Sequence, residues 1–195
     1  MSAAEIDAVV EIRALLEFWF GAAGTPEYGR FRPVWFRHDA AFDAELAGRF
    51  GRLYILAESG ALDPLLRLEG GALALVLLLD QLPRNLFRGL PRAFATDAAA
   101  RRVARFITNF NHDRHRLPTE RLFLYLPFEH SESIFDQMQS VALFHDLGNA
   151  EWTDYAVRHR DIVARFGRFP HRNAALGRPS TPEEIEFLKQ PGSSF

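Results

Sequence analysis

Two polar motifs lie within otherwise apolar stretches of the sequence, and they are the best candidates for a functional site. Residues 77–89 read LLLDQLPRNLFRG, and residues 120–132 read ERLFLYLPFEHSE. Carboxylate, amide, guanidinium and imidazole groups are costly to bury beside Leu and Phe unless they bond to one another. The two motifs therefore predict a buried or half-buried polar network, although they do not by themselves name a reaction.

Asp80 is the carboxylate of the first motif. It falls seven positions after Leu73 and four after Val76, so it continues the apolar face of a helix. An unpaired buried carboxylate would take up a proton, and we therefore expect Arg84, Arg172 or a histidine beside it. Such a network could fix a helix end or bind a ligand, because perturbed groups occur in both settings.

Pro83 is expected to end the helix that carries Asp80. The residue before a proline is disfavoured in the α region, so Leu82 should turn Arg84 and Asn85 away from that helix. Asn85 would then serve as a cap or turn residue.

Glu129 brings a second acid to an inward position. It lies four residues after Tyr125, and it faces inward if Pro127 only kinks its helix. His145 and His159 also fall in apolar stripes, where a single histidine is usually a satisfied core residue. Several such groups together predict a shared pocket, although a structural network would look the same from the sequence.

These residue types support two kinds of chemistry and one structural alternative. The leading hypothesis is a soluble helical binding module whose polar pocket holds a small anionic or polar ligand, or a peptide end, because arginine forks and histidine donors suit carboxylate and phosphate groups. The alternative is an acid/base hydrolase or lyase that uses Glu129 or Asp80 with His130. A second alternative is a purely structural or protein-interaction scaffold. The candidate ligand-binding residues are Arg84, Asn85, His130, Glu132, His159, His171, Arg172 and Asn173.

Metal, cofactor and nucleophile motifs are absent from the sequence. It contains no cysteine, no HExxH and no Glu-x-x-His pair, so no metal site is expected. Ser131 and Ser133 lack the glycines of a nucleophile elbow, and Gly70 and Gly71 are an isolated pair, not a phosphate loop. No cofactor is expected.

Composition limits the classes of partner. The chain has 195 residues, 48% of them hydrophobic, and a formal net charge of −2, which gives no electrostatic case for nucleic acid or an anionic membrane. The longest apolar run, residues 70–79, is about half a membrane span. Acids precede the apolar residues at the N-terminus, unlike in a secretory signal, so a cytoplasmic protein is expected. The oligomeric state cannot be predicted.

Helical periodicity recurs along the chain without a strand pattern of useful length. We therefore predict an all-α fold of seven to eight helices packed as hairpins in one domain, residues 1–195, with a frayed tail at 190–195. Ser133 should form a capping box with Asp136. The other residues expected at helix N-termini are Asp39, Asp63, Thr96, Thr119 and Thr181.

The sequence resembles the bacterial domain-of-unknown-function 924 family at four motifs in family order. These are EFWFG at 17–21, LLLDQLPRNLFRG, YLPFEHSE at 125–132 and RFGRFPHRNAALGRPSTPEEIEFL at 165–188. The resemblance implies a tetratricopeptide-like helical fold and no assigned activity. The positions that it singles out are Asp80, Gln81, Pro83, Arg84, Asn85, Pro127, His130, Ser131, Glu132, Pro170, His171, Arg172 and Asn173.

Overall fold

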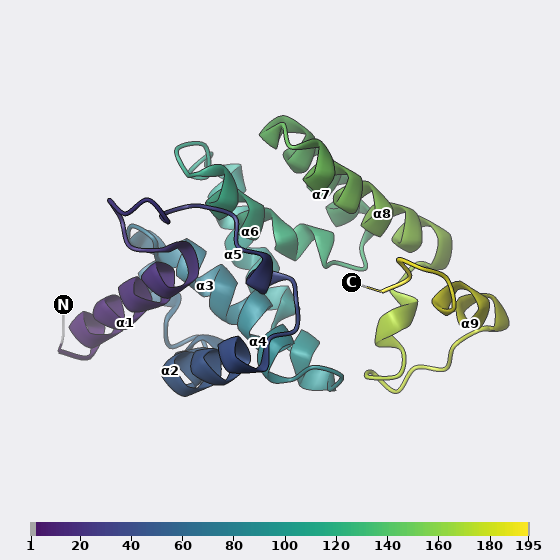
Figure 1. The fold of residues 1–195 in the computed structure, drawn as a ribbon, viewed down its shortest axis with the longest axis horizontal. Coiled ribbons are helices and arrows are strands. Elements are labelled where there is room, and N and C mark those ends of the chain that lie inside the picture. The colour runs from purple at the N-terminus through teal and green to yellow at the C-terminus, as the bar shows by residue number, and fades with distance from the viewer. Residues whose placement is uncertain (1–2, 195) are drawn as a thin grey trace.

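The computed structural model describes the backbone of residues 3–194 and the side chains of residues 8–194, and all regular structure in this part of the chain is helical (Figure 1). The predicted all-α class is confirmed. Two short helices, α3 (Gly71–Val76) and α4 (Leu82–Leu86), are joined by a π-helical turn, Leu77–Gln81, into one continuous run. With this run taken as one, the described residues form eight helices, which agrees with the predicted number.

The N-terminal third supplies two long helices. Helix α1 (Ala3–Phe20) and helix α2 (Ala40–Glu58) pack against each other and against the continuous central run. Asp39 begins α2 as predicted, because its carboxylate accepts hydrogen bonds from the backbone N–H groups of Ala41 and Phe42.

The central run lies in the interior of the protein. Every residue from Gly71 to Pro83 is buried, which explains why this segment is apolar on all sides. The apolar core around it includes Trp19, Trp35 and Phe123, whose rings contact one another in edge-to-face and stacked pairs. The polar residues of the first motif are therefore carried by the most deeply buried element of the molecule.

Pro83 does not end the central helix, so that prediction was wrong. Leu82 keeps α-helical torsion angles (φ −53°, ψ −48°), and its N–H donates to the Leu77 carbonyl across the π turn. The carbonyl of Leu79, four residues before the proline, accepts instead from Thr96 Oγ1 at 2.5 Å. An outside hydroxyl thus replaces the backbone donor that proline lacks, and the chain continues as a helix.

The following helices form an antiparallel array. Helix α5 (Asp97–Asn109) packs against α3 and α6 (Pro118–Glu129), while α7 (Ile134–Leu147) packs along α6 and α8 (Ala150–Phe166) (Figure 1). Only Gly148 and Asn149 separate α7 from α8, so these two helices form a hairpin. The array places the end of α6 beside the central run.

Three of the predicted helix caps act differently. Thr96 and Ser133 occupy N-cap positions, but neither side chain accepts a capping hydrogen bond. Thr119 lies inside α6, where its hydroxyl donates to the carbonyl of Gly29 at 2.8 Å. Ser131, not Ser133, bonds to Asp136, at 2.7 Å. The hydroxyls of Thr96 and Thr119 thus bond to carbonyls distant in sequence, and Ser131 takes the carboxylate expected to pair with Ser133.

The residues after α8 lie at the side of the helical array, and the end of the chain turns back towards it (Figure 1). Four short helical turns interrupt the connecting segments between the longer helices. They are Pro33–Trp35, Asp63–Arg67, Pro91–Phe94 and Pro170–Arg172. Helix α9 (Pro182–Leu188) begins with the predicted capping box between Thr181 and Glu184. Beyond it, the hydroxyl of Ser193 is tied to the carbonyl of Leu188 at 3.1 Å, and Phe195 lies outside the described residues.

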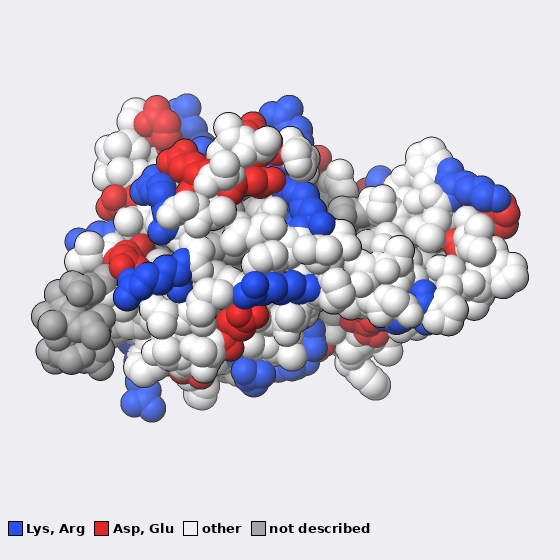
Figure 2. Space-filling view, turned by 90° about the horizontal axis from the view of Figure 1, so that it is seen from below, with Lys and Arg blue, Asp and Glu red and all other residues white. Residues whose placement is uncertain are grey.

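The surface shows no extended area of one charge on the face drawn in Figure 2, where basic and acidic side chains alternate among uncharged ones. None of the helices formed by residues 3–194 has both the length and the apolar character needed to cross a lipid bilayer.

Candidate functional site

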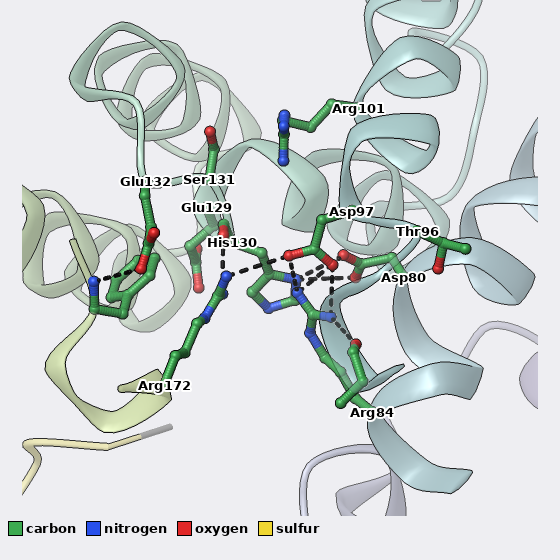
Figure 3. Close-up of polar contacts among 12 residues, drawn as sticks. Asp80, Arg84, Thr96, Asp97, Arg101, Glu129, His130, Ser131, Glu132 and Arg172 are labelled. Carbon is green, nitrogen blue, oxygen red and sulfur yellow. Dashed lines mark hydrogen bonds and ion pairs between the residues drawn. The ribbon is translucent and has the colours of Figure 1, made fainter. Parts of the chain in front are cut away.

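Asp80 and His130 form the centre of the candidate site. Asp80 lies in the π turn and is fully buried, and His130 Nδ1 is 2.8 Å from its Oδ1 and 2.9 Å from its Oδ2 (Figure 3). Gln81 Nε2 donates to Oδ2 at 2.6 Å, and Arg84 Nη2 lies 3.5 Å from Oδ1. The prediction that Asp80 has an arginine and a histidine beside it is confirmed.

The charges around Asp80 decide its protonation. Burial alone would raise the pKa of this carboxyl, but His130, Arg84 and the hydrogen bonds outweigh burial and hold the pKa well below its usual range. The ionised carboxylate can only accept, so His130 Nδ1 carries the hydrogen of the bond. Burial and the charge of Arg84 lower the pKa of His130, which is therefore the neutral imidazole with an unprotonated Nε2.

Asp97 joins the first motif to the C-terminal motif. At the start of α5, it accepts from Arg84 Nη1 at 2.9 Å and Nη2 at 3.2 Å, and from Arg172 Nη1 at 3.2 Å (Figure 3). Arg172 Nη2 also donates to the carbonyl of His130 at 2.8 Å. Three segments far apart in sequence, around residues 80, 130 and 172, therefore meet as predicted.

Arg172 is held in a buried slot between two aromatic rings. Its guanidinium carbon lies 4.7 Å from the ring centres of both Phe94 and Phe169. Burial and the neighbouring charge of Arg84 lower its pKa to about 10, so it remains a cation near neutrality. Its Nε is buried and has no hydrogen-bond partner among the described residues.

Glu129 and His159 form a second buried pair. His159 Nδ1 lies 3.2 Å from Glu129 Oε1 and 2.9 Å from the carbonyl of Tyr155. Burial and the negative charge of Asp80 raise the pKa of Glu129 to about 8. Burial lowers the pKa of His159 to about 3, so both groups are mainly uncharged at neutral pH in spite of the short distance.

A cavity of about 760 Å³ opens onto these residues. His130, Glu129 and Arg172 lie along its wall, whereas Asp80 and Asp97 lie behind that wall. A volume of this size suits a small molecule or one or two residues of a peptide. The lining includes the catalytic candidate Glu129 and six of the candidate ligand-binding residues, Arg84, Asn85, His130, His159, His171 and Arg172.

His171 and Asn85 lie at the same cavity. Burial and the charge of Arg172 lower the pKa of His171 to about 4, so its imidazole is uncharged near neutral pH. Asn85 Oδ1 accepts from Arg88 Nη2 at 2.8 Å, within α4 and the turn after it. Asn85 is not the turn residue that the sequence suggests, because the helix continues past Pro83.

Two other candidates, Glu132 and Asn173, do not line the cavity. Glu132 is bound by both terminal nitrogens of Arg178, at 2.7 and 2.8 Å, and by the N–H of Phe169 at 2.8 Å. Asn173 is buried and bonds to Ser180 Oγ and Arg178 Nε. Both therefore hold the C-terminal segment in place.

The interpretation of His145 as an inward residue was wrong. Its side chain is 81% exposed on α7 and lies outside the cavity lining, whereas His159 is buried. Both histidines follow apolar residues at helical spacing. The packing of α7 and α8, and not this spacing, decides which of the two side chains faces the core.

Asp97 and Thr96 are site residues that the sequence analysis missed. The sequence suggested only a helix cap for Thr96. Asp97 lies in the first turn of a helix, where an acid is normally explained by its favourable interaction with the helix dipole. The nine arginines from Arg84 to Arg121, against few acids, were the available indication that Asp97 would be paired. No group of three or more acids and histidines among residues 8–194 is placed to hold a metal ion.

Comparison with known proteins identifies the family without assigning an activity. Residues 15–192 match a family described as a bacterial protein of unknown function, DUF924. A solved structure of a protein of unknown function from Agrobacterium tumefaciens is similar, with a TM-score of 0.85 and 40% identity over 94% of this chain and 99% of that chain. No curated protein matches the chain. The protein therefore belongs to the bacterial domain-of-unknown-function 924 family.

Proposed function

We propose that this protein binds a small molecule in the cavity and transfers a proton to or from it, with His130 as the general base. The observation that carries the proposal is the bond between ionised Asp80 and His130 Nδ1, at 2.8 and 2.9 Å, in the wall of that cavity. A carboxylate in this position fixes the tautomer of the imidazole and stabilises the imidazolium that forms when Nε2 accepts a proton.

Glu129 is the corresponding acid. Its pKa of about 8 keeps most of the carboxyl protonated at neutral pH, while the lowered pKa of His130 keeps the imidazole unprotonated. The two environments shift the pKa values of Glu129 and His130 in opposite directions. One cavity therefore contains a protonated acid and an unprotonated base at the same pH. His130 would take a proton from the substrate or from a water molecule, and Glu129 would return one to the group that gains the electron pair. This chemistry fits a hydrolase or a lyase.

The arginines play a supporting part in this proposal. Arg84 is fully engaged by Asp97 and Asp80. Its guanidinium therefore holds these two carboxylates in place and does not serve as a donor to a ligand. Arg172 is engaged by Asp97 and by the carbonyl of His130, and its unpartnered Nε is buried. In the proposal its guanidinium therefore holds the wall beside His130 in place.

The experiment compares the conversion of a bacterial metabolite mixture by the wild-type protein and by two variants, followed by mass spectrometry. His130→Gln should abolish a conversion seen with the wild-type protein, and Asp80→Asn should reduce it by about 10²–10⁴-fold, the usual contribution of an acid–base group. The matched controls are His145→Gln and Asp146→Asn, whose side chains are exposed on α7. Equal conversion by the His130→Gln protein would remove His130 as the base.

A binding module without catalysis is the second candidate, and a cavity wall that contains Arg84, His130 and Arg172 favours it. In that case small carboxylates or phosphate should raise the melting temperature in a concentration-dependent way, because they stabilise only the folded state. Arg172→Ala should abolish the shift while the circular-dichroism spectrum stays helical. A thermal shift in the absence of any conversion would support binding alone.

A further inference from the structure

The end of helix α6 carries the proposed base, and the backbone carbonyls there need donors from outside the helix. Helix α6 ends at Glu129, and His130 follows it with torsion angles φ −79° and ψ −4°. The N–H groups of His130 and Ser131 donate back to carbonyls in the last turn of α6, at 2.8 and 3.1 Å. The last carbonyls of a helix have no partner within it, so those of Glu129, His130 and Ser131 require side-chain donors.

Gln137, near the start of α7, supplies two of these donors. Its side chain is fully buried, and an amide nitrogen carries two hydrogens. The two shortest bonds of Nε2 run to the carbonyl of Glu129 at 2.6 Å and to that of Ser131 at 2.7 Å. Arg172 Nη2 donates to the carbonyl between them, that of His130, at 2.8 Å. The amide of Gln137 therefore binds the chain on both sides of the proposed base.

The orientation of the Gln137 amide follows from its surroundings. Carbonyl oxygens only accept hydrogen bonds, so the nitrogen of the amide, and not its oxygen, must face them. Oε1 is then buried without a hydrogen-bond partner among the described residues. A buried acceptor without a partner destabilises a fold, so the two bonds to the end of α6 form in spite of this loss.

We propose that Gln137 is a positioning residue for His130, whose amide holds the end of α6 so that His130 Nδ1 stays against Asp80. Asp80 belongs to the central run and His130 to the end of α6, so their contact depends on where that end lies. The contact is close to both carboxylate oxygens, at 2.8 and 2.9 Å, and a displacement of about 1 Å can cost ~100-fold in rate. Only this effect on a rate rests on the proposed function.

The ¹⁵N NMR spectrum of the His130 ring tests the positioning role without a substrate. Gln137→Met keeps a side chain of similar size but removes both donors, and Gln137→Asn keeps the amide on a side chain that is one methylene shorter. In either variant the form of the ring protonated at Nε2 should rise to about 10% or more of the population, because Nδ1 is no longer held against Asp80. The wild-type spectrum in both variants would overturn the proposal.

Two variants control for a general loosening of α7. Ser140→Ala removes a fully buried hydroxyl about one turn after Gln137, and this hydroxyl has no hydrogen-bond partner among the described residues. Thr153→Val removes a hydroxyl of α8 that donates to the carbonyl of Phe144, in the last part of α7, at 3.1 Å. Both variants should keep the ring tautomer of the wild-type protein. A change as large in Thr153→Val as in Gln137→Met would overturn the proposal, because any lost hydrogen bond of α7 would then have the same effect.

A measurement on the wild-type protein gives a result even if neither Gln137 variant folds. NMR scalar couplings across hydrogen bonds should link Gln137 Nε2 to the carbonyl carbons of Glu129 and Ser131. The two amide hydrogens should also exchange slowly with water, because they are buried and bonded. Rapid exchange of both hydrogens, without either coupling, would overturn the proposal.

Conversion of a substrate separates the positioning role from the proposed function. Gln137→Met should lower kcat by about 10–100-fold and change KM less, and it should have a smaller effect in the Asp80→Asn protein, because both changes act through one contact. A changed tautomer with no conversion by the wild-type protein would keep the positioning role and remove the acid–base proposal. Conversion that His130→Gln abolishes but Gln137→Met leaves at the wild-type rate would keep the acid–base proposal and overturn the positioning role.

Discussion

Asp80 determines the state of the residues around it more than any other single side chain. Its full burial would favour the neutral acid, yet His130, Gln81 and Arg84 supply enough hydrogen bonds and positive charge to keep it ionised. The ionised carboxylate fixes the tautomer of His130, and its charge helps to keep Glu129 protonated. The acid and the base of the proposed site thus depend on one carboxylate that does not itself reach the cavity.

Arg84→Ala should lower the free energy of unfolding by about 3–5 kcal/mol, because it leaves Asp97 and Asp80 buried with less positive charge beside them. Urea unfolding followed by circular dichroism measures the change. The control is Arg114→Ala, since Arg114 and Asp146 form an exposed pair at 3.7 Å that should contribute about 0–1 kcal/mol. Equal small losses for both variants would mean that Arg84 does not support the buried acids.

Glu129→Gln should change how stability depends on pH. The folded-state pKa of about 8 lies above the unfolded value, so the wild-type protein binds this proton more tightly when folded. It therefore loses stability from this group as pH rises from about 4.5 to 8. The glutamine variant should lose less over that range, so its stability relative to wild type should rise by up to a few kcal/mol.

Urea unfolding of both proteins between pH 5 and 9 measures this difference. His159, whose lowered pKa acts in the opposite direction, is present in both proteins and cancels in the comparison. A constant difference across the pH range would show that Glu129 is ionised in the folded protein throughout.

At the scale of elements, the site depends on the π-helical turn inside the central run. Such turns are frequent at functional sites because they rotate side chains out of the regular helical register. Here the turn carries Asp80 and Gln81, and the hydroxyl of Thr96 satisfies the Leu79 carbonyl that Pro83 leaves without a donor. The end of α6 then presents His130 to Asp80.

Thr96→Val should lower the free energy of unfolding by about 1–3 kcal/mol, because a buried carbonyl loses its donor at nearly constant side-chain volume. Thr96→Ser keeps the hydroxyl and should restore most of the loss. Thr25→Val is the control, since the Thr25 hydroxyl donates to the Ala22 carbonyl at an exposed turn. A loss of the same size in the serine variant would point to packing of the methyl group instead.

Local patterns were enough to predict the inward position of Asp80, the opening of α2 at Asp39 and the capping box at Thr181. Each of these depends on residues within about two helical turns. The continuation past Pro83 could not be predicted, because it needs the hydroxyl of Thr96, which lies 17 residues after the Leu79 carbonyl that it satisfies. The pairing of Asp97 and the different exposure of His145 and His159 also depend on packing between helices. The spacing of residues within one helix does not reveal that packing.

At the scale of the whole molecule, the C-terminal segment, residues 167–194, forms part of the cavity wall. This segment supplies His171 and Arg172 to the wall, and Glu132 holds it through Arg178 and the N–H of Phe169. Glu132 lies two residues after His130, so the loop that carries the proposed base also anchors the segment beside it. Ligand binding and the order of the C-terminal segment should therefore be coupled.

Glu132→Ala should loosen residues 167–194 without unfolding the α6–α8 array, because three hydrogen bonds to that carboxylate are lost. Hydrogen–deuterium exchange should become faster in peptides from this segment and stay unchanged in peptides from α2. Glu183→Ala, which removes an exposed pair with Arg165, is the control. Uniformly faster exchange in both regions would indicate global destabilisation instead of local release.

The ¹⁵N NMR spectrum of the His130 ring tests the central claim most directly. The account predicts a protonated Nδ1 and an unprotonated Nε2 at pH 7, because ionised Asp80 accepts from Nδ1 and the pKa of the imidazole is lowered by burial and Arg84. The Asp80→Asn variant should lose this strict preference for one tautomer. A proton on Nε2 in the wild-type protein, or a doubly protonated ring at pH 7, would contradict the assignment of His130 as the base.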